Sequence, residues 1–186
     1  MDAQIDVNEN INQEQASLLS LWQQIKEDWI AHGRDWSKPG FRAVAVHRFG
    51  VWKSKIQPQI LQLPFRILYG MLYRKVRNTY GIELPCTVKL GRRVVIYHQG
   101  SIIINANSII GDDCMISQEV TLGGRYVDSP WDAPQLGKGV AIGAGAKILG
   151  KISIGDHVKI GSNAVVLCDV PAGATAVGIP ARIILK

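Results

Sequence analysis

The chain has 186 residues, of which 47% are hydrophobic and 19% are charged, a composition that excludes an intrinsically disordered protein. The formal net charge of +6 suits small anionic ligands and does not by itself predict nucleic-acid binding. Three cysteines without a CxxC pair indicate neither a disulfide framework nor a zinc site, and no apolar run is long enough for a transmembrane segment.

The first 80 residues are expected to be helical. The N-terminal segment is acidic and lacks a secretory signal pattern, which predicts a cytoplasmic protein. Gly33 marks the end of a first helix, and Ser37 is the expected cap of a second helix over about residues 39–55. A further helix is expected from about residue 58 or 64 to residue 80. The first helix is predicted from apolar residues at helical spacing, namely Leu18, Leu21, Trp22, Ile25 and Trp29.

From residue 82 a six-residue period replaces the helical one. A large aliphatic residue recurs every six positions, often with glycine after it, which is typical of a parallel β-helix with three flat faces. A glycine-rich α/β domain with short strands is the alternative. We predict a β-helix over residues 81–186, with one register break that extrudes residues 123–135 as a loop. The periodic residues are Ile82, Val88, Val94, Ile104, Ile110, Ile116, Leu122, Leu136, Ile142, Ile148, Ile154, Ile160 and Val166.

Three motifs make the pattern more specific: Thr121-Leu122-Gly123-Gly124, the run GAGAKILG at 143–150, and GIPAR at 178–182. With the six-residue period, they make residues 34–186 resemble the hexapeptide-repeat acyltransferases, and above all the serine O-acetyltransferases. The resemblance implies a mainly β fold, a left-handed parallel β-helix behind a small helical region. It also implies a homotrimer, or a dimer of trimers, with sites between subunits. Acetyl-CoA is the implied co-substrate, a hydroxyl group the acceptor, and no metal is required.

Acetyl transfer to a hydroxyl group requires a base, and His98 is the candidate. The resemblance places the family's catalytic histidine there, and a surface histidine is the alternative. Glu83 stands where the family has an aspartate that orients this histidine, and the alternative is a solvated glutamate. Asp35 matches an acid that contacts the acceptor, with a turn or cap residue as an equal alternative.

Small residues mark the predicted coenzyme site. By the resemblance, Gly124, Ala144 and Ser162 fall at positions that contact CoA, where the lack of a large side chain admits the pantetheine arm. Lys159 and Arg182 are candidates for contact with the CoA phosphates, although each alone is more simply a solvated charge.

The acceptor residues depart from the family pattern. Tyr97 replaces an aspartate, and Asp132 replaces an arginine, so the cation that an α-carboxylate needs is missing from the loop. We therefore expect a sugar acceptor in surface or exopolysaccharide biosynthesis, with Tyr97 and Trp131 against its ring, local packing of each aromatic being the alternative. Two other functions stay open. One is L-serine O-acetylation in cysteine biosynthesis; the other is a non-catalytic trimeric assembly or a membrane-surface module built on the basic residues 38–77.

Overall fold

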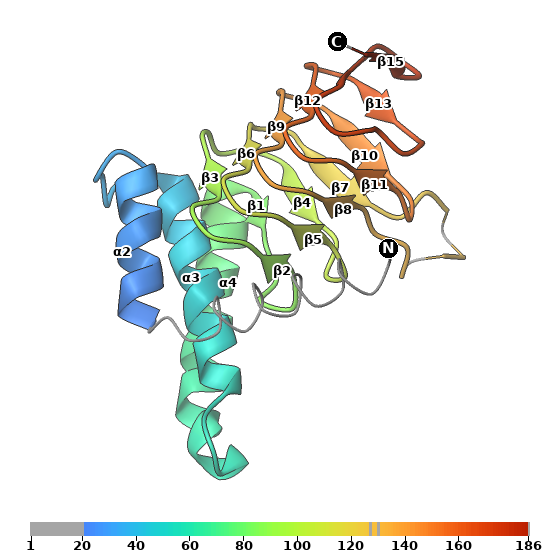
Figure 1. Cartoon of the computed structure of the whole chain (residues 1–186). Coiled ribbons are helices and arrows are strands. Elements are labelled where there is room, and N and C mark those ends of the chain that lie inside the picture. Colours follow the sequence, from blue (N-terminus) through green and yellow to red (C-terminus); the bar gives the residue numbers. More distant parts are fainter. Residues whose placement is uncertain (1–20, 127, 130, 186) are drawn as a thin grey trace, which may run out of the picture.

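The computed structural model describes residues 21–126, 128–129 and 131–185, with helices first and strands after them (Figure 1). Within this part of the chain, no helix is long and apolar enough to cross a membrane. Leu18 of the predicted first helix lies outside the described residues. The helical elements are α2 (Leu21–Ala31), α3 (Pro39–Ser54), the 3-10 helix η1 (Gln59–Gln62) and α4 (Leu63–Tyr80).

Two local signals in the helical part have different outcomes. Gly33 follows α2 with a φ of 76°, a left-handed conformation that glycine adopts without strain. The prediction that Ser37 caps the next helix is wrong, because Lys38 is the N-cap of α3 and no side chain bonds to the helix end. The Ser37 hydroxyl instead donates to Asp35 Oδ1 at 2.6 Å, since that carboxylate lies two residues away in the same turn.

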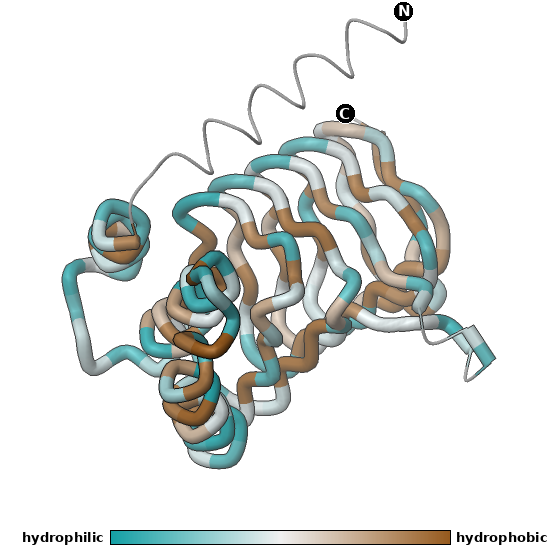
Figure 2. Tube along the Cα trace, turned by 90° about the horizontal axis from the view of Figure 1, so that it is seen from below, coloured by the Kyte–Doolittle hydropathy of each residue, from teal (hydrophilic) through white to brown (hydrophobic). Residues whose placement is uncertain are grey.

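The strands wind into stacked coils that form three faces (Figures 1 and 2). Apart from the antiparallel β14–β15 pair, the paired strands are parallel, which confirms the expected parallel solenoid. Face 1 contains β1 (Ile82–Glu83), β4 (Ile102–Ile104), β7 (Thr121–Gly123), β10 (Lys147–Leu149) and β13 (Val165–Val166). Face 2 contains β2 (Lys89–Leu90), β5 (Ile109–Ile110), β8 (Gln135–Leu136) and β11 (Ser153–Ile154). Face 3 contains β3 (Val95–Ile96), β6 (Met115–Ile116), β9 (Ala141–Ile142), β12 (Lys159–Ile160), β14 (Thr175–Val177) and β15 (Arg182–Ile184).

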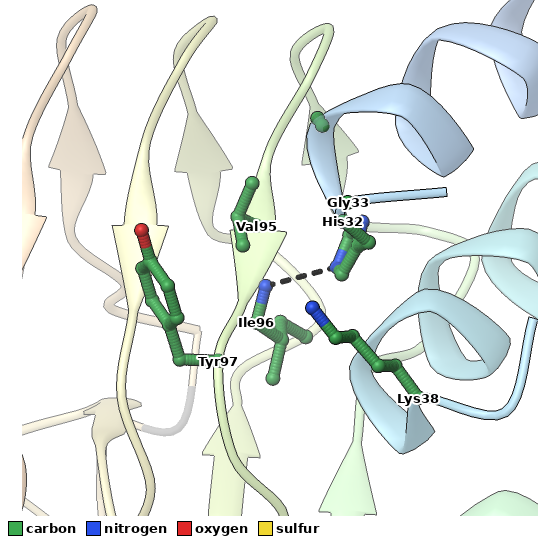
Figure 3. Close-up of a pocket in the computed structure, with 7 residues that line it drawn as sticks. His32, Gly33, Lys38, Val95, Ile96 and Tyr97 are labelled. Carbon is green, nitrogen blue, oxygen red and sulfur yellow. Dashed lines mark hydrogen bonds between the residues drawn. The ribbon is translucent and has the colours of Figure 1, made fainter. Parts of the chain in front are cut away.

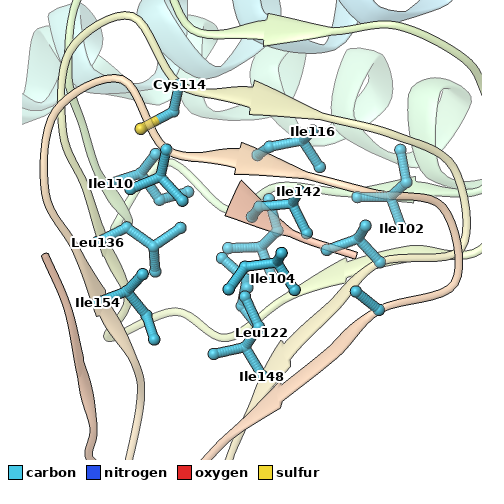
Figure 4. Close-up of a cluster of buried hydrophobic side chains, with 14 of the residues drawn as sticks. Ile102, Ile104, Ile110, Cys114, Ile116, Leu122, Leu136, Ile142, Ile148 and Ile154 are labelled. Carbon is cyan, nitrogen blue, oxygen red and sulfur yellow. The ribbon is translucent and has the colours of Figure 1, made fainter. Parts of the chain in front are cut away.

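All the residues of the predicted six-residue series are buried, and many of them meet in the core shown in Figure 4. A second buried residue lies two positions before most strand residues, for example Val140 before Ile142 and Val158 before Ile160. Each flat turn therefore places two apolar side chains inside the coil. This continuous core, stacked from coil to coil, is what a repeat of this kind needs for stability.

The prediction of a single register break is wrong. Ile82 pairs with Ile102, so the first coil has 20 residues, whereas Lys147 pairs with Val165 after 18. Consequently Leu90 and Ile96, rather than Val88 and Val94, stack on the strand residues of the next coil. The two extra residues lie at the corner between β3 and β4. The six-residue period does not reveal them, because both buried positions of each turn are aliphatic and either one continues the period.

Side chains from the helices close the open edge of the first coil. An edge strand leaves backbone groups unpaired, and here buried polar side chains satisfy them. His32 Nε2 accepts from the Ile96 N–H at 3.2 Å. His47 Nε2 donates to the Val88 carbonyl at 3.0 Å, and Arg48 donates to the Leu90 carbonyl at 2.8 Å. The helices thus hold the coil that bears the candidate base.

Candidate functional site

His98 lies in the enlarged corner between β3 and β4. The corner turns through Gly100 and Ser101, whose φ angles of 112° and 50° both lie in the left-handed region. Its backbone is held by hydrogen bonds from Gly100 N–H to the Tyr80 carbonyl and from Ile102 N–H to the Gly81 carbonyl, each 2.9 Å long. The two-residue insertion therefore presents His98, which is exposed, on a tethered backbone.

Glu83 lies on β1, on face 1, next to the corner that carries His98. Its register partner is Ile103, five residues after His98 in the chain. Glu83 is partly exposed on this strand and His98 is exposed, and the pairing of the two side chains stays a prediction. Burial raises the pKa of Tyr73 on α4, and the charge of Glu83 adds to this effect, which places the carboxylate close to that helix.

Ala144 and Ser162 lie on the same corner line as His98, two and three coils further on. The line is continuous through backbone hydrogen bonds, since Gly145 N–H donates to the Gln118 carbonyl at 3.0 Å and Asn163 N–H to the Ala144 carbonyl at 2.8 Å. Small residues along this line leave the backbone accessible to an extended ligand. Two of the predicted coenzyme residues thus share one edge of face 1 with the candidate base.

Lys159 and Arg182 are exposed on face 3, beside that edge. Lys159 is on β12 and pairs with Thr175, and Arg182 is on β15 and pairs with Val177. Neither side chain forms an ion pair within the described residues, so both are available to an anionic ligand. No cluster of three or more metal-binding side chains occurs in that same part of the chain.

The loop residues lie at the opposite edge of face 1. The chain leaves the β-helix after β7 and returns at β8 (Figure 1), and Trp131 in this loop is 80% exposed. Asn107 Nδ2 donates to the Trp131 carbonyl at 3.3 Å, and Asp132 is partly exposed. Gly124 begins the loop, where an added Cβ would lie 3.0 Å from the Ser129 carbonyl oxygen. Within one subunit, these residues do not meet the group around His98.

Asp35 acts locally as a turn residue. Its Oδ1 accepts from both the N–H and the hydroxyl of Ser37, at 2.8 and 2.6 Å. These bonds lower the pKa of the Asp35 carboxyl, with smaller contributions from the charges of Lys38 and Arg42. The turn reading of Asp35 therefore has direct support, and a contact with an acceptor stays a prediction.

Tyr97 is 56% exposed beside His98, with 6.4 Å between the two ring centroids. Its hydroxyl donates to Met115 Sδ at 3.5 Å on the next coil. Tyr97 is also one of the residues that line a cavity of about 170 Å³ between β3 and the turn from α2 to α3 (Figure 3). Sequence reasoning had not found this cavity, because its walls come from two distant segments.

The aromatic residues within the segment 38–77, which was considered for a membrane surface, pack largely on one another. The Trp52 and Phe65 ring centroids are 5.3 Å apart, and those of Tyr69 and Tyr73 are 5.7 Å apart. The α3–α4 hairpin that carries them extends away from the β-helix (Figure 1), and Ile60 at its end is 78% exposed. Contact with a lipid surface stays a prediction.

Comparisons with known proteins agree with this architecture. Residues 133–168 match the family model of the bacterial transferase hexapeptide (six repeats). The serine acetyltransferase of Synechococcus elongatus is 39% identical over 148 residues, 80% of this chain and 58% of that protein, so this chain spans little more than half of such a relative. The structure of serine acetyltransferase from Brucella abortus in complex with coenzyme A superposes with a TM-score of 0.74 at 29% identity, over 88% of this chain and 67% of that one.

A relative of similar length carries the assignment. The serine acetyltransferase of Helicobacter pylori strain 26695 is 45% identical over 148 residues, which are 80% of this chain and 82% of that protein. A match over about four fifths of both chains is longer than the repeats alone and extends into the helical region. The chain therefore belongs to the serine acetyltransferase family of hexapeptide-repeat proteins.

Proposed function

We propose that this protein is an acetyl-CoA-dependent O-acetyltransferase in which His98 is the general base. The observation that carries the proposal is the enlarged corner, which presents His98 at the head of the small-residue line through Ala144 and Ser162. In a relative, coenzyme A is bound to this fold. Left-handed coiling of the β-helix and a cytoplasmic location belong to the same proposal.

The reaction is a direct transfer. His98 Nε2 or Nδ1 takes the proton of the acceptor hydroxyl as its oxygen forms a bond to the thioester carbonyl carbon. Backbone N–H groups along the corner stabilise the negative charge on the carbonyl oxygen. The C–S bond then breaks, and the proton held on His98 passes to the thiolate. Glu83 is proposed to orient the imidazole of His98. Because no hydrogen bond joins the two side chains in the part of the chain that the structure describes, one of them must change its rotamer when the substrate binds.

The coenzyme is proposed to lie along the corner line. Ala144 and Ser162 give its pantetheine arm access to the backbone, and Lys159 and Arg182 meet its phosphate groups. Gly124 lies at the other edge of face 1 and reaches the same ligand only from a neighbouring subunit. A homotrimer that pairs unlike edges of adjacent subunits would bring Gly124, Trp131 and Asp132 to the site.

L-Serine is the acceptor that we propose first. The relatives that match most of the chain are named serine acetyltransferases, and this favours serine over the sugar that the sequence had suggested. Nothing in the comparisons supports a role in polysaccharide biosynthesis. A sugar acceptor stays as the second candidate on one observation, the half-exposed ring of Tyr97 beside His98.

The test is a thiol-release assay with acetyl-CoA and either L-serine or a panel of nucleotide sugars. We expect turnover with serine, and a loss of about 100-fold or more in kcat for His98→Ala at an unchanged melting temperature. His157→Ala is the matched control, because His157 is also exposed but lies on the turn between β11 and β12. Turnover of a sugar in preference to serine would reverse the order of the two acceptors. Equal turnover by His98→Ala would remove His98 as the base.

A further inference from the structure

The cavity lined by Tyr97 lies between the helical part and β3, the strand that precedes the His98 corner (Figure 3). Its walls are residues 31–33 at the end of α2, Lys38 at the start of α3, and Val95, Ile96 and Tyr97 on and after β3. Its volume of about 170 Å³ is well above the roughly 10–15 Å³ that one water molecule needs on this scale. A small functional group with adjacent carbon atoms can therefore enter it.

The cavity carries one formal charge, the ammonium group of Lys38. Gly33 makes room for this group, since an added Cβ there would lie 3.3 Å from Lys38 Nζ. The Lys38 ammonium group has no ion-pair or hydrogen-bond partner among the described residues. The nearby carboxylate of Asp35 is bonded to Ser37, and Arg42 is held by the Trp36 carbonyl and the Tyr80 hydroxyl. Lys38 is thus an unpaired cation at the cavity.

The other basic side chain in the wall is His32, whose two ring nitrogens are both bonded within the fold. Its Nδ1–H donates to the Asp28 carbonyl at 2.7 Å, and its Nε2 accepts from Ile96 N–H at 3.2 Å. Burial lowers its pKa, so the ring stays neutral at pH 7. It supplies no second charge, and the cavity contains no carboxylate to oppose Lys38.

The backbone that carries Lys38 is packed closely against the strand that leads to the candidate base. Gly40, two residues later, packs so closely on β3 that an added Cβ would lie 2.0 Å from the Ile96 carbonyl oxygen. Tyr97 and His98 follow Ile96 directly. The start of α3 and the His98 corner therefore move as one unit, as a site that positions two ends of one small molecule requires.

We propose that Lys38 binds the carboxylate of the acceptor in this cavity, so that the acceptor extends past Tyr97 and presents its hydroxyl group to His98. The proposal deepens the proposed function by naming the acceptor class, a small hydroxy compound with a carboxylate. It also supplies the cation that is missing from the loop, where Asp132 stands.

The test compares acceptors with and without the carboxylate: L-serine with its methyl ester, and D-galacturonate with D-galactose, in which a CH2OH group replaces the carboxylate. For the pair that is acetylated, we expect wild type to prefer the acid. We expect Lys38→Met to raise KM for the acid by about 10- to 100-fold, the usual range for a lost charge-assisted hydrogen bond. Values of kcat, KM for acetyl-CoA and KM for the neutral acceptor should stay unchanged, and Lys38→Arg should restore much of the affinity.

Lys151→Met is the matched control, because Lys151 is an exposed lysine on the turn between β10 and β11, away from the cavity. Turnover with an unchanged KM for the acid in Lys38→Met would overturn the role of Lys38 and leave the proposed function intact. Calorimetric titration with L-serine and with D-galacturonate tests the site without turnover. If the protein shows no transferase activity but wild type binds either acid more tightly than Lys38→Met does, the carboxylate site is supported and the proposed enzymatic function is rejected. Equal binding of both acids by the two proteins would reject the site.

Discussion

The ion pair between Asp28 and Arg48 should be a principal support of the junction between helices and β-helix. Arg48 Nε donates to Asp28 Oδ2 at 2.9 Å, and the two side chains are only 6% and 1% exposed. Arg48 also donates to the carbonyls of Leu90 and Gly91, at 2.8 and 2.5 Å, on the open edge of the first coil. The guanidinium thus neutralises one buried charge and satisfies two edge carbonyls.

Arg48→Met removes all of these interactions at similar side-chain length. Breaking a buried ion pair by removing one partner costs about 3–5 kcal/mol, because the remaining charge is left without compensation. The two orphaned carbonyls add to this cost, so we expect a loss of at least about 3 kcal/mol. That is a large part of the roughly 5–15 kcal/mol that stabilises an ordinary domain.

The measurement is guanidinium unfolding of wild type and variants at one protein concentration, because subunit association would shift the midpoint. Arg93→Met is the control, since Arg93 and Asp113 form an exposed pair worth about 0–1 kcal/mol. The double variant Asp28→Leu/Arg48→Met removes both charges and should unfold at a higher denaturant concentration than Arg48→Met alone. The reasoning is refuted if Arg48→Met loses no more than Arg93→Met, or if the double variant is the less stable of the two.

Two further predictions concern stability. Burial lowers the pKa of His47 to about 4 from an ordinary 6.5, so the unfolded chain takes up this proton before the folded one as the pH falls. The free energy of unfolding that neutral His47 contributes is complete above pH 6.5 and should fall by about 1.4 kcal/mol per pH unit toward pH 4. Denaturant unfolding at pH 7, 6 and 5 measures this fall. An equal fall in His47→Gln would contradict the prediction. Gly40→Ala should lower the melting temperature by several degrees or prevent folding, since its Cβ would meet the Ile96 carbonyl oxygen at 2.0 Å. Gly70→Ala is the control, because Gly70 lies in the interior of α4 with nothing within 4 Å of the new Cβ, and it should raise stability by up to about 1 kcal/mol. Similar effects of the two substitutions on the melting temperature would contradict the clash at Gly40.

Sequence reasoning was most successful in the β-helix because its determinants are local and repeated. One aliphatic residue every six positions is enough to predict a flat turn, and the members of the six-residue series from Leu136 to Val166 are all buried. It failed at the first coil, where Val88 and Val94 continue the same arithmetic although Leu90 and Ile96 are the stacked strand residues. Two aliphatic positions per turn make both registers equally regular in the sequence.

The sequence by itself therefore determined the repeat and the family, while His98 as the base stays a prediction. The tertiary structure decided which candidate residues share an edge: Ala144 and Ser162 lie on the line of His98, whereas Trp131 and Asp132 lie across face 1. It also showed the cavity at Lys38. The six-residue period and the motifs report only on residues that are close in the sequence. The shared edge and the cavity depend instead on the length of the first coil and on how closely α3 packs against β3. Those are set by contacts between segments more than 50 residues apart, such as Gly40 with Ile96, which no local pattern encodes.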